Sequence, residues 1–350
     1  MKAIDADVAI IGGGPAGCSA ALTLRFKGFS VVMIDDLGGR EKPTETSCPA
    51  LKQVLGSLGA ESAMTACEPC HGIVSNWGRY STILKPAMTS PFGNAWFIHR
   101  SRFDFCLHQL TRNRGVVWLE AKAKEMSSMG DEVEIIANGF RIAARWVVIA
   151  AGSPTWTANF TSQKPDKIDS LVAFWAKMPV RLTERLLRIE TAEFGWWYSC
   201  PGEKDDAFVC CVTDAAGARS AKIADGVRWN AHFQKTQIFQ QSFGTATATL
   251  VNIISASTTS LPFKHGRFWI AAGDAALKLD PLGSSGVIVA LESGRRAAIA
   301  IMASMHGSHD GLEKYVNWSD QISKDFSRQR RLQYRLEAET RRYGFWKRRG

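Results

Sequence analysis

The first part of the chain carries the hydrophobic pattern of a nucleotide-binding α/β protein. An unbroken apolar run at residues 8–11 predicts a strand buried on both faces, and the apolar periodicity of residues 18–27 predicts a helix packed against it. Similar patterns predict further strands at 29–34, 116–120, 132–137, 141–150 and 267–272, and further helices at 50–58, 101–112 and 285–305. The predicted fold class is therefore α/β, with helices packed on a largely parallel sheet.

A second pattern interrupts the first. Apolar and polar positions alternate at residues 168–176, 207–213 and 246–254, which predicts strands of an antiparallel sheet. A helix is expected at 223–239, helical arms at 312–343, and loops over most of 67–98. The chain thus reads as a nucleotide-binding unit with an inserted antiparallel-sheet domain and C-terminal helices.

Composition and charge narrow the function classes. The 350 residues are 45% hydrophobic and 22% charged, which is enough for a sizeable core. No apolar run has the length of a membrane span and no signal peptide is apparent, so we expect a cytoplasmic protein without a membrane partner. The net charge of +10 is uneven, because residues 324–350 hold ten Lys and Arg against three Asp and Glu.

This basic segment predicts a helix with a solvated basic face. Docking of an acidic protein partner on that face is the alternative interpretation. Nucleic acid is not expected as a partner, because no recognisable nucleic-acid module accompanies the charge.

A glycine-rich loop follows the first predicted strand. Gly12, Gly14 and Gly17 form a G-x-G-x-x-G motif between a strand and a helix, the context in which this motif binds a dinucleotide. Asp35, at the end of the next strand, can accept hydrogen bonds from ribose hydroxyls. NAD and FAD proteins share this motif, so it predicts a dinucleotide without naming one.

A second fingerprint some 260 residues later favours FAD. An apolar strand delivers Gly273 and Asp274, whose carboxylate can accept a hydrogen bond from a ribityl chain. The segment from Pro281 to Gly286 then opens a helix whose backbone N–H groups can stabilise negative charge on a reduced flavin ring. Arg100 is a candidate hydrogen-bond donor to the same cofactor. The predicted cofactor-binding residues are Gly12, Gly14, Pro15, Ala16, Gly17, Asp35, Glu45, Thr46, Arg100, Gly273, Asp274, Pro281, Gly283, Ser284, Ser285 and Gly286.

These motifs define the expected domains. The fold is predicted as an FAD-binding Rossmann-like (GR2) domain with an inserted antiparallel-sheet substrate domain and C-terminal helices. We expect the FAD-binding domain at 1–75, 99–160 and 263–310, the substrate domain at 161–262 with a loop at 76–98, and a basic helical arm at 311–350. No metal site is expected.

The set of motifs resembles the p-hydroxybenzoate hydroxylase class of flavoproteins, in particular its branch with the tryptophan halogenases. Residues 43–49 (PTETSCP) are similar to the G-E-S/T-L-P-P element of that branch, with Thr44 in place of glycine. Residues 195–201 (GWWYSCP) stand where halogenases carry W-x-W-x-I-P, with Tyr198 in place of the second tryptophan. This difference, and the lack of an alignable catalytic lysine, count against halogenation; Lys85 is expected to be a solvated loop residue.

Three further segments resemble the flavoprotein maturases that help to build cysteine tryptophylquinone cofactors. They are residues 76–79 (NWGR), 91–100 (PFGNAWFIHR) and 339–349 (ETRRYGFWKRR). In that family the substrate is a tryptophan inside a partner amine dehydrogenase or amino-acid oxidase. The resemblance therefore implies a protein substrate, the precursor of a tryptophylquinone enzyme.

The mechanism implied by the resemblance uses O₂ as co-substrate. Reduced FAD forms a C4a-hydroperoxide, whose distal oxygen is attacked by an electron-rich aromatic carbon. An aromatic cavity would exclude water and seat an indole. The candidate catalytic residues are Trp77, Trp96, Trp196, Trp197, Tyr198 and His99, for each of which ordinary core packing is the alternative.

Several functions stay open at this point. A monooxygenase of a small aromatic molecule, a flavin-dependent halogenase and a non-catalytic flavin-containing chaperone are the alternatives to a peptidyl-tryptophan monooxygenase. Hydroperoxide formation would exclude the chaperone, and bromide-dependent product formation would favour the halogenase. The electron donor is either NAD(P)H or a separate flavin reductase, and no second dinucleotide fold is evident for the former.

Overall fold

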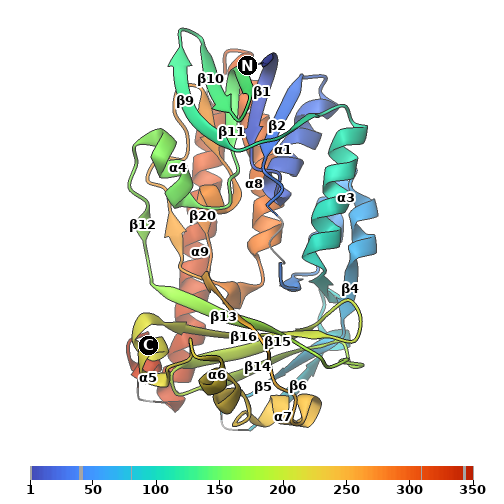
Figure 1. The fold of residues 1–350 in the computed structure, drawn as a ribbon, viewed down its shortest axis with the longest axis vertical. Helices are drawn as coiled ribbons and strands as arrows, with labels where there is room; N and C mark the ends of the chain where they lie inside the picture. The colour runs from blue at the N-terminus through green and yellow to red at the C-terminus, as the bar shows by residue number, and fades with distance from the viewer. Residues whose placement is uncertain (1, 39–41, 80, 309, 342–343, 350) are drawn as a thin grey trace.

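The computed structural model describes the chain except residues 1, 39–41, 80, 309, 342–343 and 350. Its described elements form two layers, one sheet in the upper half of Figure 1 and another across the lower half. Helix α9 (Asp310–Thr340) runs from the upper layer down to the lower sheet, where the C terminus also lies. One helix therefore bridges the two layers.

The upper sheet is the predicted nucleotide-binding sheet. In sheet order its strands are β8 (Val117–Glu120), β2 (Val31–Asp35), β1 (Lys2–Ile11), β11 (Phe140–Ile149), β10 (Glu132–Ala137) and β9 (Ala123–Met129), with β19 (Trp269–Ala271) paired to β11. β1 runs parallel to both β2 and β11. β10 runs antiparallel to its two neighbours, β11 and β9. The alternation along β1 sends Val8 and Ile10 into one core and Ala9 and Ile11 into another, which explains the unbroken apolar run.

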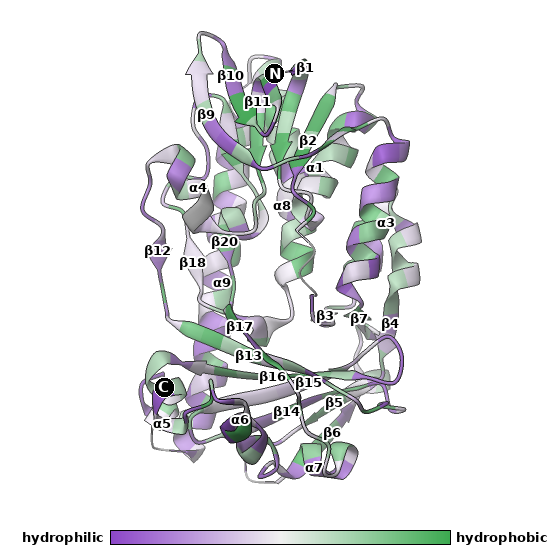
Figure 2. Cartoon of the chain, in the orientation of Figure 1, coloured by the Kyte–Doolittle hydropathy of each residue, from purple (hydrophilic) through white to green (hydrophobic). Residues whose placement is uncertain are grey.

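Helices cover one face of this sheet and hold the site elements in place. They are α1 (Pro15–Phe26), α2 (Leu51–Ser57), α3 (Arg100–Asn113) and α8 (Gly286–Met305). Figure 2 shows the central strands β1 and β11 as largely hydrophobic. The α/β class and the FAD-type unit predicted from the sequence are confirmed.

The lower sheet contains the predicted inserted antiparallel strands, to which β5 adds in parallel to β14. In sheet order its strands are β17 (Val251–Ser255), β13 (Leu171–Met178), β16 (Ala207–Asp214), β15 (Gly195–Pro201), β14 (Leu186–Ala192), β5 (Gly72–Ser75) and β6 (Ile83–Pro86). Helices α6 (Gly226–Phe233) and α7 (Gln237–Phe243) pack on one face. Tyr334 of α9 and the aromatic residues Phe345 and Trp346 of α10 (Gly344–Lys347) pack on the other.

Smaller elements connect the two layers. A first small sheet contains β3 (Glu45–Ser47), β7 (Ala95–Ile98) and β4 (Cys67–Cys70), and a second contains β12 (Asp166–Lys167), β18 (Thr259–Ser260) and β20 (Leu277–Lys278). Helices α4 (Pro154–Thr161) and α5 (Ala215–Ala221) lie between strands. Within the described residues, no helix is long and apolar enough to span a membrane.

Three local predictions were wrong. The helix expected at 223–239 is two helices, because the buried Glu190 carboxylate of β14 accepts hydrogen bonds from the N–H groups of Gln237 and Ile238 and so starts α7 separately. The strand expected at 246–254 begins only at Val251. The region 67–98 contains four short strands instead of mainly loop, and β5 among them already pairs with β14 of the lower sheet. Such pairings join distant segments, which a local pattern does not show.

Candidate functional site

The glycine loop has the geometry that a nucleotide loop requires. Gly12 has φ +106°, and a Cβ there would lie 2.3 Å from the carbonyl oxygen of Ala150. A Cβ on Gly17 would lie 1.9 Å from the carbonyl oxygen of Gly12, so helix and loop touch here. A Cβ on Gly14 would meet no atom within 4 Å, because this residue faces a cavity at the start of α1. The first and third glycines thus serve packing, and the second leaves room for a ligand.

Asp35 and two residues that the sequence analysis missed hold this loop. The Asp35 carboxylate accepts hydrogen bonds from the N–H groups of Gly13 and Leu37, the latter at 2.7 Å. His108 of α3 places Nε2 2.7 Å from the Gly13 carbonyl oxygen, and the Trp118 ring packs against this imidazole at 4.6 Å. Neither His108 nor Trp118 belongs to a local motif, and only the tertiary fold brings them to the loop.

Arg100 stands at the cavity wall within a charged cluster. Its Nε donates to Oδ1 of Asp104 at 3.2 Å, and its guanidinium also pairs with the Glu45 carboxylate. Lys42 Nζ donates to the other oxygen of Asp104 at 2.5 Å. Burial by itself lowers the pKa of Arg100, but the two carboxylates outweigh it and raise that pKa. The carboxylates of Glu45 and Asp104 therefore keep a fixed cation, Arg100, beside the glycine loop. Asp104 and Lys42 are further residues that the sequence analysis missed.

The first of two cavities, the nucleotide cavity, has a volume of about 340 Å³. It lies against the glycine loop and the start of α8. The predicted cofactor residues that line it are Gly12, Gly14, Pro15, Ala16, Asp35, Glu45, Arg100, Asp274 and Gly286. Gly17 supports it from behind, through its contact with Gly12.

The second cavity, the aromatic cavity, has a volume of about 490 Å³ and lies between the upper layer and the lower sheet. The predicted residues that line it are Glu45, Thr46, Trp196, Tyr198, Asp274, Pro281, Ser284, Ser285 and Gly286. Glu45, Asp274 and Gly286 line both cavities, so the two spaces meet at these three residues.

The second fingerprint, which contains Gly273, Asp274 and Gly286, forms the junction where the two cavities meet. Gly273 has φ +62° and donates its N–H to Ser293 Oγ at 2.8 Å, which directs the chain into the short turn that carries Asp274. At Gly286, the first residue of α8, an added Cβ would meet no atom within 4 Å. The buried Ser285 Oγ beside it has no hydrogen-bond partner. The start of α8 therefore presents open backbone and an unsatisfied hydroxyl to the junction.

Gly283 has a different role. A Cβ on Gly283 would lie 2.7 Å from the Phe326 ring of α9, so this glycine lets α9 pack against the loop. It lines neither cavity. The neighbouring Ser284 has φ +47°, and its hydroxyl is within hydrogen-bond distance of Thr46 Oγ1, 2.5 Å away.

Two carboxyl groups line the aromatic cavity, the half-buried Asp274 at the junction and the buried Asp280 beside it. Burial raises the pKa of Asp274 to about 6 and that of Asp280 to about 6. Asp280, which the sequence analysis did not select, accepts hydrogen bonds from the Leu282 N–H at 2.8 Å and from the Tyr334 hydroxyl at 3.0 Å. Tyr334 in turn accepts from Nε1 of Trp196 at 3.1 Å. This chain of hydrogen bonds connects α9, the loop before α8 and the lower sheet.

The structure separates the predicted catalytic aromatics. Trp196 and Tyr198 lie in the wall of the aromatic cavity, with ring centres 5.5 Å apart. Trp77 packs edge-on against Trp196 at 5.9 Å and lies behind that wall. Trp197 points to the opposite face of the sheet, where it contacts Trp229 at 5.1 Å.

Trp96 and His99 line neither cavity. Trp96 of β7 packs against the core of the upper layer. His99 is buried at the start of α3, with Nδ1 3.4 Å from Thr44 Oγ1. Lys85 is exposed on β6, a strand and not the expected loop, and Lys278 is the lysine that lines the aromatic cavity.

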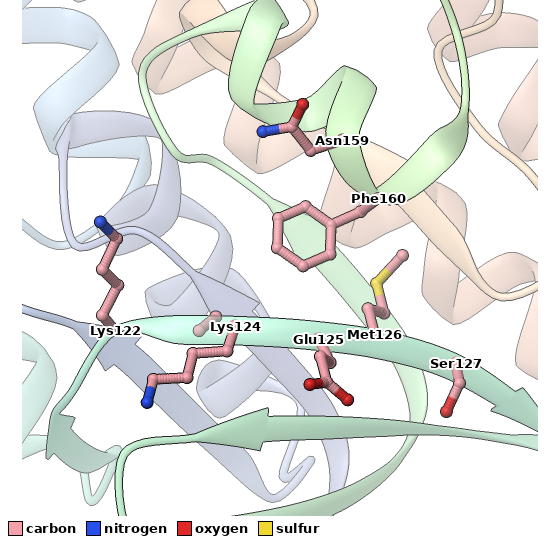
Figure 3. A pocket seen from close by; sticks show the side chains of 8 residues that line it. Lys122, Lys124, Glu125, Met126, Ser127, Asn159 and Phe160 are labelled. Atoms are coloured by element: carbon pink, nitrogen blue, oxygen red, sulfur yellow. The ribbon is translucent and has the colours of Figure 1, made fainter.

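A further groove of about 700 Å³ lies elsewhere, between β9 and α4. Figure 3 shows Phe160 of α4 directed toward β9, which carries Lys124, Glu125 and Met126 nearby. None of the predicted site residues lines this groove. Within the described residues, no group of three or more His, Cys, Asp and Glu side chains could hold a metal ion.

The joined cavities suit FAD, an elongated dinucleotide with two negative phosphates. Two helix N-termini, those of α1 and α8, border the space. Arg100 and Lys42 also line the nucleotide cavity, where both are paired with carboxylates. Open space at Gly14 and Gly286 allows close approach of a ligand to the backbone. The pyrophosphate would lie at the start of α1 and the ring at the junction.

Comparisons with known proteins agree with this geometry. The model of the pyridine nucleotide-disulphide oxidoreductase family matches residues 6–174. The FAD-dependent oxidoreductase LodB of Marinomonas mediterranea is 24% identical over 98% of this chain and 96% of its own length. The chain is an FAD-dependent oxidoreductase.

Solved structures place this oxidoreductase among proteins with the flavin-dependent halogenase fold. The flavin-dependent halogenase CmlS superposes with a TM-score of 0.85 and 22% identity, over 99% of this chain and 67% of CmlS. The peptidyl tryptophan dihydroxylase QhpG, described as essential for tryptophylquinone cofactor biogenesis, gives a TM-score of 0.82 and 20% identity, over 99% of this chain and 78% of QhpG. The chain thus shares the fold of these two flavoproteins.

Proposed function

We propose that this flavoprotein oxygenates the indole ring of a tryptophan residue in a partner protein, the precursor of a tryptophylquinone enzyme. The observation that carries the proposal is the aromatic cavity, which joins the nucleotide cavity at Glu45, Asp274 and Gly286. Its volume is in the range of small-molecule sites. The likeness to QhpG, a peptidyl tryptophan dihydroxylase, supports the same substrate class.

The cavity wall would exclude water and orient the indole. Trp196 and Tyr198 provide aromatic surface on one side, and Leu187, Ile189 and Ala173 provide aliphatic surface from the same sheet. Aromatic rings pack against such a wall by edge or offset contacts. A dry cavity also protects a reactive oxygen donor from hydrolysis.

The junction residues would control charge. Bound reduced FAD supplies the electrons that activate O₂, and a separate flavin reductase can provide it in reduced form. Backbone N–H groups at the start of α8 would stabilise negative charge on the ring. Asp280, buried in the cavity lining with a pKa raised by burial to about 6, can hold or release a proton near neutral pH.

The test is co-expression with a precursor of a tryptophylquinone enzyme, followed by mass spectrometry of its tryptophan peptides. We expect a gain of one or two oxygen atoms on one tryptophan with the parent protein, and none with Gly14→Val, whose side chain would fill the nucleotide cavity. An unmodified precursor beside a fully FAD-loaded parent protein, supplied with reductant and O₂, would refute the proposal.

Halogenation is the second candidate function. Flavin-dependent halogenases are among the relatives, including armH3 of Armillaria mellea, and Lys278 lines the aromatic cavity. The Lys278 ammonium already donates to the Ser255 carbonyl oxygen at 2.7 Å, however. Bromide-dependent bromination of an aromatic substrate that disappears in Lys278→Met would establish this alternative.

A further inference from the structure

β17 forms an open edge of the lower sheet at the mouth of the aromatic cavity. Among the described strands it pairs only with β13, and Figure 2 shows it on the side of this sheet that faces the upper layer. Residues 253–256, at the end of this strand, line the cavity. The edge and the substrate cavity are therefore continuous.

The register shows which backbone groups of β17 point outward. The Ala256 N–H donates to the Leu171 carbonyl oxygen of β13, and the Ser255 carbonyl oxygen accepts from Lys278 on the other side. Because these directions alternate along an antiparallel pair, the N–H and C=O groups of Val251 and Ile253 also point away from β13. No hydrogen bond from another described residue reaches them.

Apart from Lys278 at Ser255, the edge lacks the usual protection against strand pairing. Residues 251–255 (VNIIS) contain no charge and no proline, and the Ile253 and Ile254 side chains are 56% and 46% exposed. Natural proteins usually cover or charge such an edge, because it recruits other strands. An uncovered apolar edge beside a substrate cavity fits an extended polypeptide better than a small molecule.

We propose that β17 binds the protein substrate by strand addition, with an extended segment of the substrate antiparallel to β17 and its tryptophan inserted into the aromatic cavity. This inference rests on the proposed function and names how the substrate is recognised. Ile254 lies opposite Ala173, a cavity residue, so both share the cavity face. A substrate side chain opposite Ile254 shares this face, whereas the adjacent substrate residue, opposite Ile253, exchanges both backbone hydrogen bonds with Ile253.

Equilibrium binding to the oxidised FAD-loaded protein tests the inference without any oxygenation. The probes are free indole and a short peptide with one central tryptophan between threonine and valine residues, and the signal is the flavin absorbance. Ile253→Pro removes one outward N–H and keeps the pairing with β13. Ile253→Thr keeps that N–H and serves as the matched control.

We expect Ile253→Pro to bind the peptide about tenfold more weakly than Ile253→Thr does. Because Ile253 lines the cavity, both variants change that wall, and we expect the two variants to bind indole equally. Methylation of the backbone N–H of a residue next to the tryptophan should cause a similar loss. Methylation of the backbone N–H of the tryptophan itself should not. Equal peptide binding by the proline and threonine variants, or loss only on methylating the backbone N–H of the tryptophan, would overturn the inference. Failure of oxygenation with intact peptide binding would instead refute the proposed function alone.

Discussion

The two layers of the molecule meet at one site, but they differ in how their site residues are arranged along the sequence. In the upper layer, most of the predicted cofactor residues belong to short motifs, as when Gly12, Gly14 and Gly17 place the start of α1 against the nucleotide cavity. In the lower layer, the cavity wall joins the consecutive strands β13, β14 and β15 to β17, which lies much further along the chain. The motifs that predict cofactor binding are therefore local in sequence, whereas both cavities are assembled by the tertiary fold.

The largest expected effect is a loss of FAD affinity, caused by a substitution in the upper layer alone. Gly14→Val places a side chain in open space that faces the nucleotide cavity, at an ordinary backbone conformation of φ −72°. We expect FAD affinity to fall about a thousandfold, because the pyrophosphate can no longer approach the backbone. Flavin absorbance titration measures this loss.

The matched control is Gly226→Val, at the start of α6, where an added Cβ also meets no atom within 4 Å. Both variants should unfold at denaturant concentrations close to that of the parent apoprotein. Normal FAD binding by Gly14→Val would show that the cofactor lies elsewhere.

The next largest effect comes from Asp280, at the boundary between the layers. It appears in the pH dependence of the free energy of unfolding. The pKa of Asp280 is about 6 in the folded protein against a usual 3.8, because burial penalises its charge. Between about pH 4 and pH 6 the folded state holds a proton that the unfolded state has released, so stability falls as pH rises through this window. The full loss is about 3 kcal/mol.

Asp280→Asn should remove this loss, so that the variant gains stability relative to the parent as pH rises from 4 to 7. Urea unfolding of the apoproteins measures the difference, and Asp205→Asn on the surface is the control. A constant difference between Asp280→Asn and the parent across this range would contradict the assigned burial.

A third prediction compares the two faces of the lower sheet. Trp196→Phe changes the cavity wall and removes the hydrogen bond to Tyr334, so we expect indole binding to weaken about tenfold. Trp197→Phe acts on the opposite core, so we expect a loss of about 1–2 kcal/mol in the free energy of unfolding and unchanged indole binding. Equal effects of both variants on indole binding would contradict the placement of the cavity.

The smallest effect is expected on the basic surface of α9. Arg328 and Arg335 are 74% and 69% exposed in their side chains and pair with nearby carboxylates on the same helix. Arg328→Gln and Arg335→Gln should each change stability by less than about 0.5 kcal/mol. A larger loss, measured by thermal unfolding, would show that this face packs on the body and is not solvated.

The same contrast explains what the sequence could predict. The glycine loop, Asp35, Asp274 and the start of α8 could be assigned because strand, turn and helix follow one another directly. The partners of these residues could not, since His108 comes from α3 and Tyr334 from α9. Among the tryptophans, identical side chains at 196 and 197 have opposite surroundings, which only the strand's orientation decides.

The open edge of β17 also could not be predicted from the local sequence. The alternating pattern at 246–254 predicted a strand, but the length of that strand and its open side depend on β13 and on Lys278. The break between α6 and α7 likewise depends on Glu190 of β14.

A crystal structure of the FAD complex tests the central claim most directly, namely that the two cavities meet at the flavin ring. We predict the pyrophosphate at the start of α1 and the ring between Asp274 and Gly286, with one face open to Trp196 and Tyr198. A ring bound outside this junction, with the aromatic cavity separated from it by protein, would contradict the account.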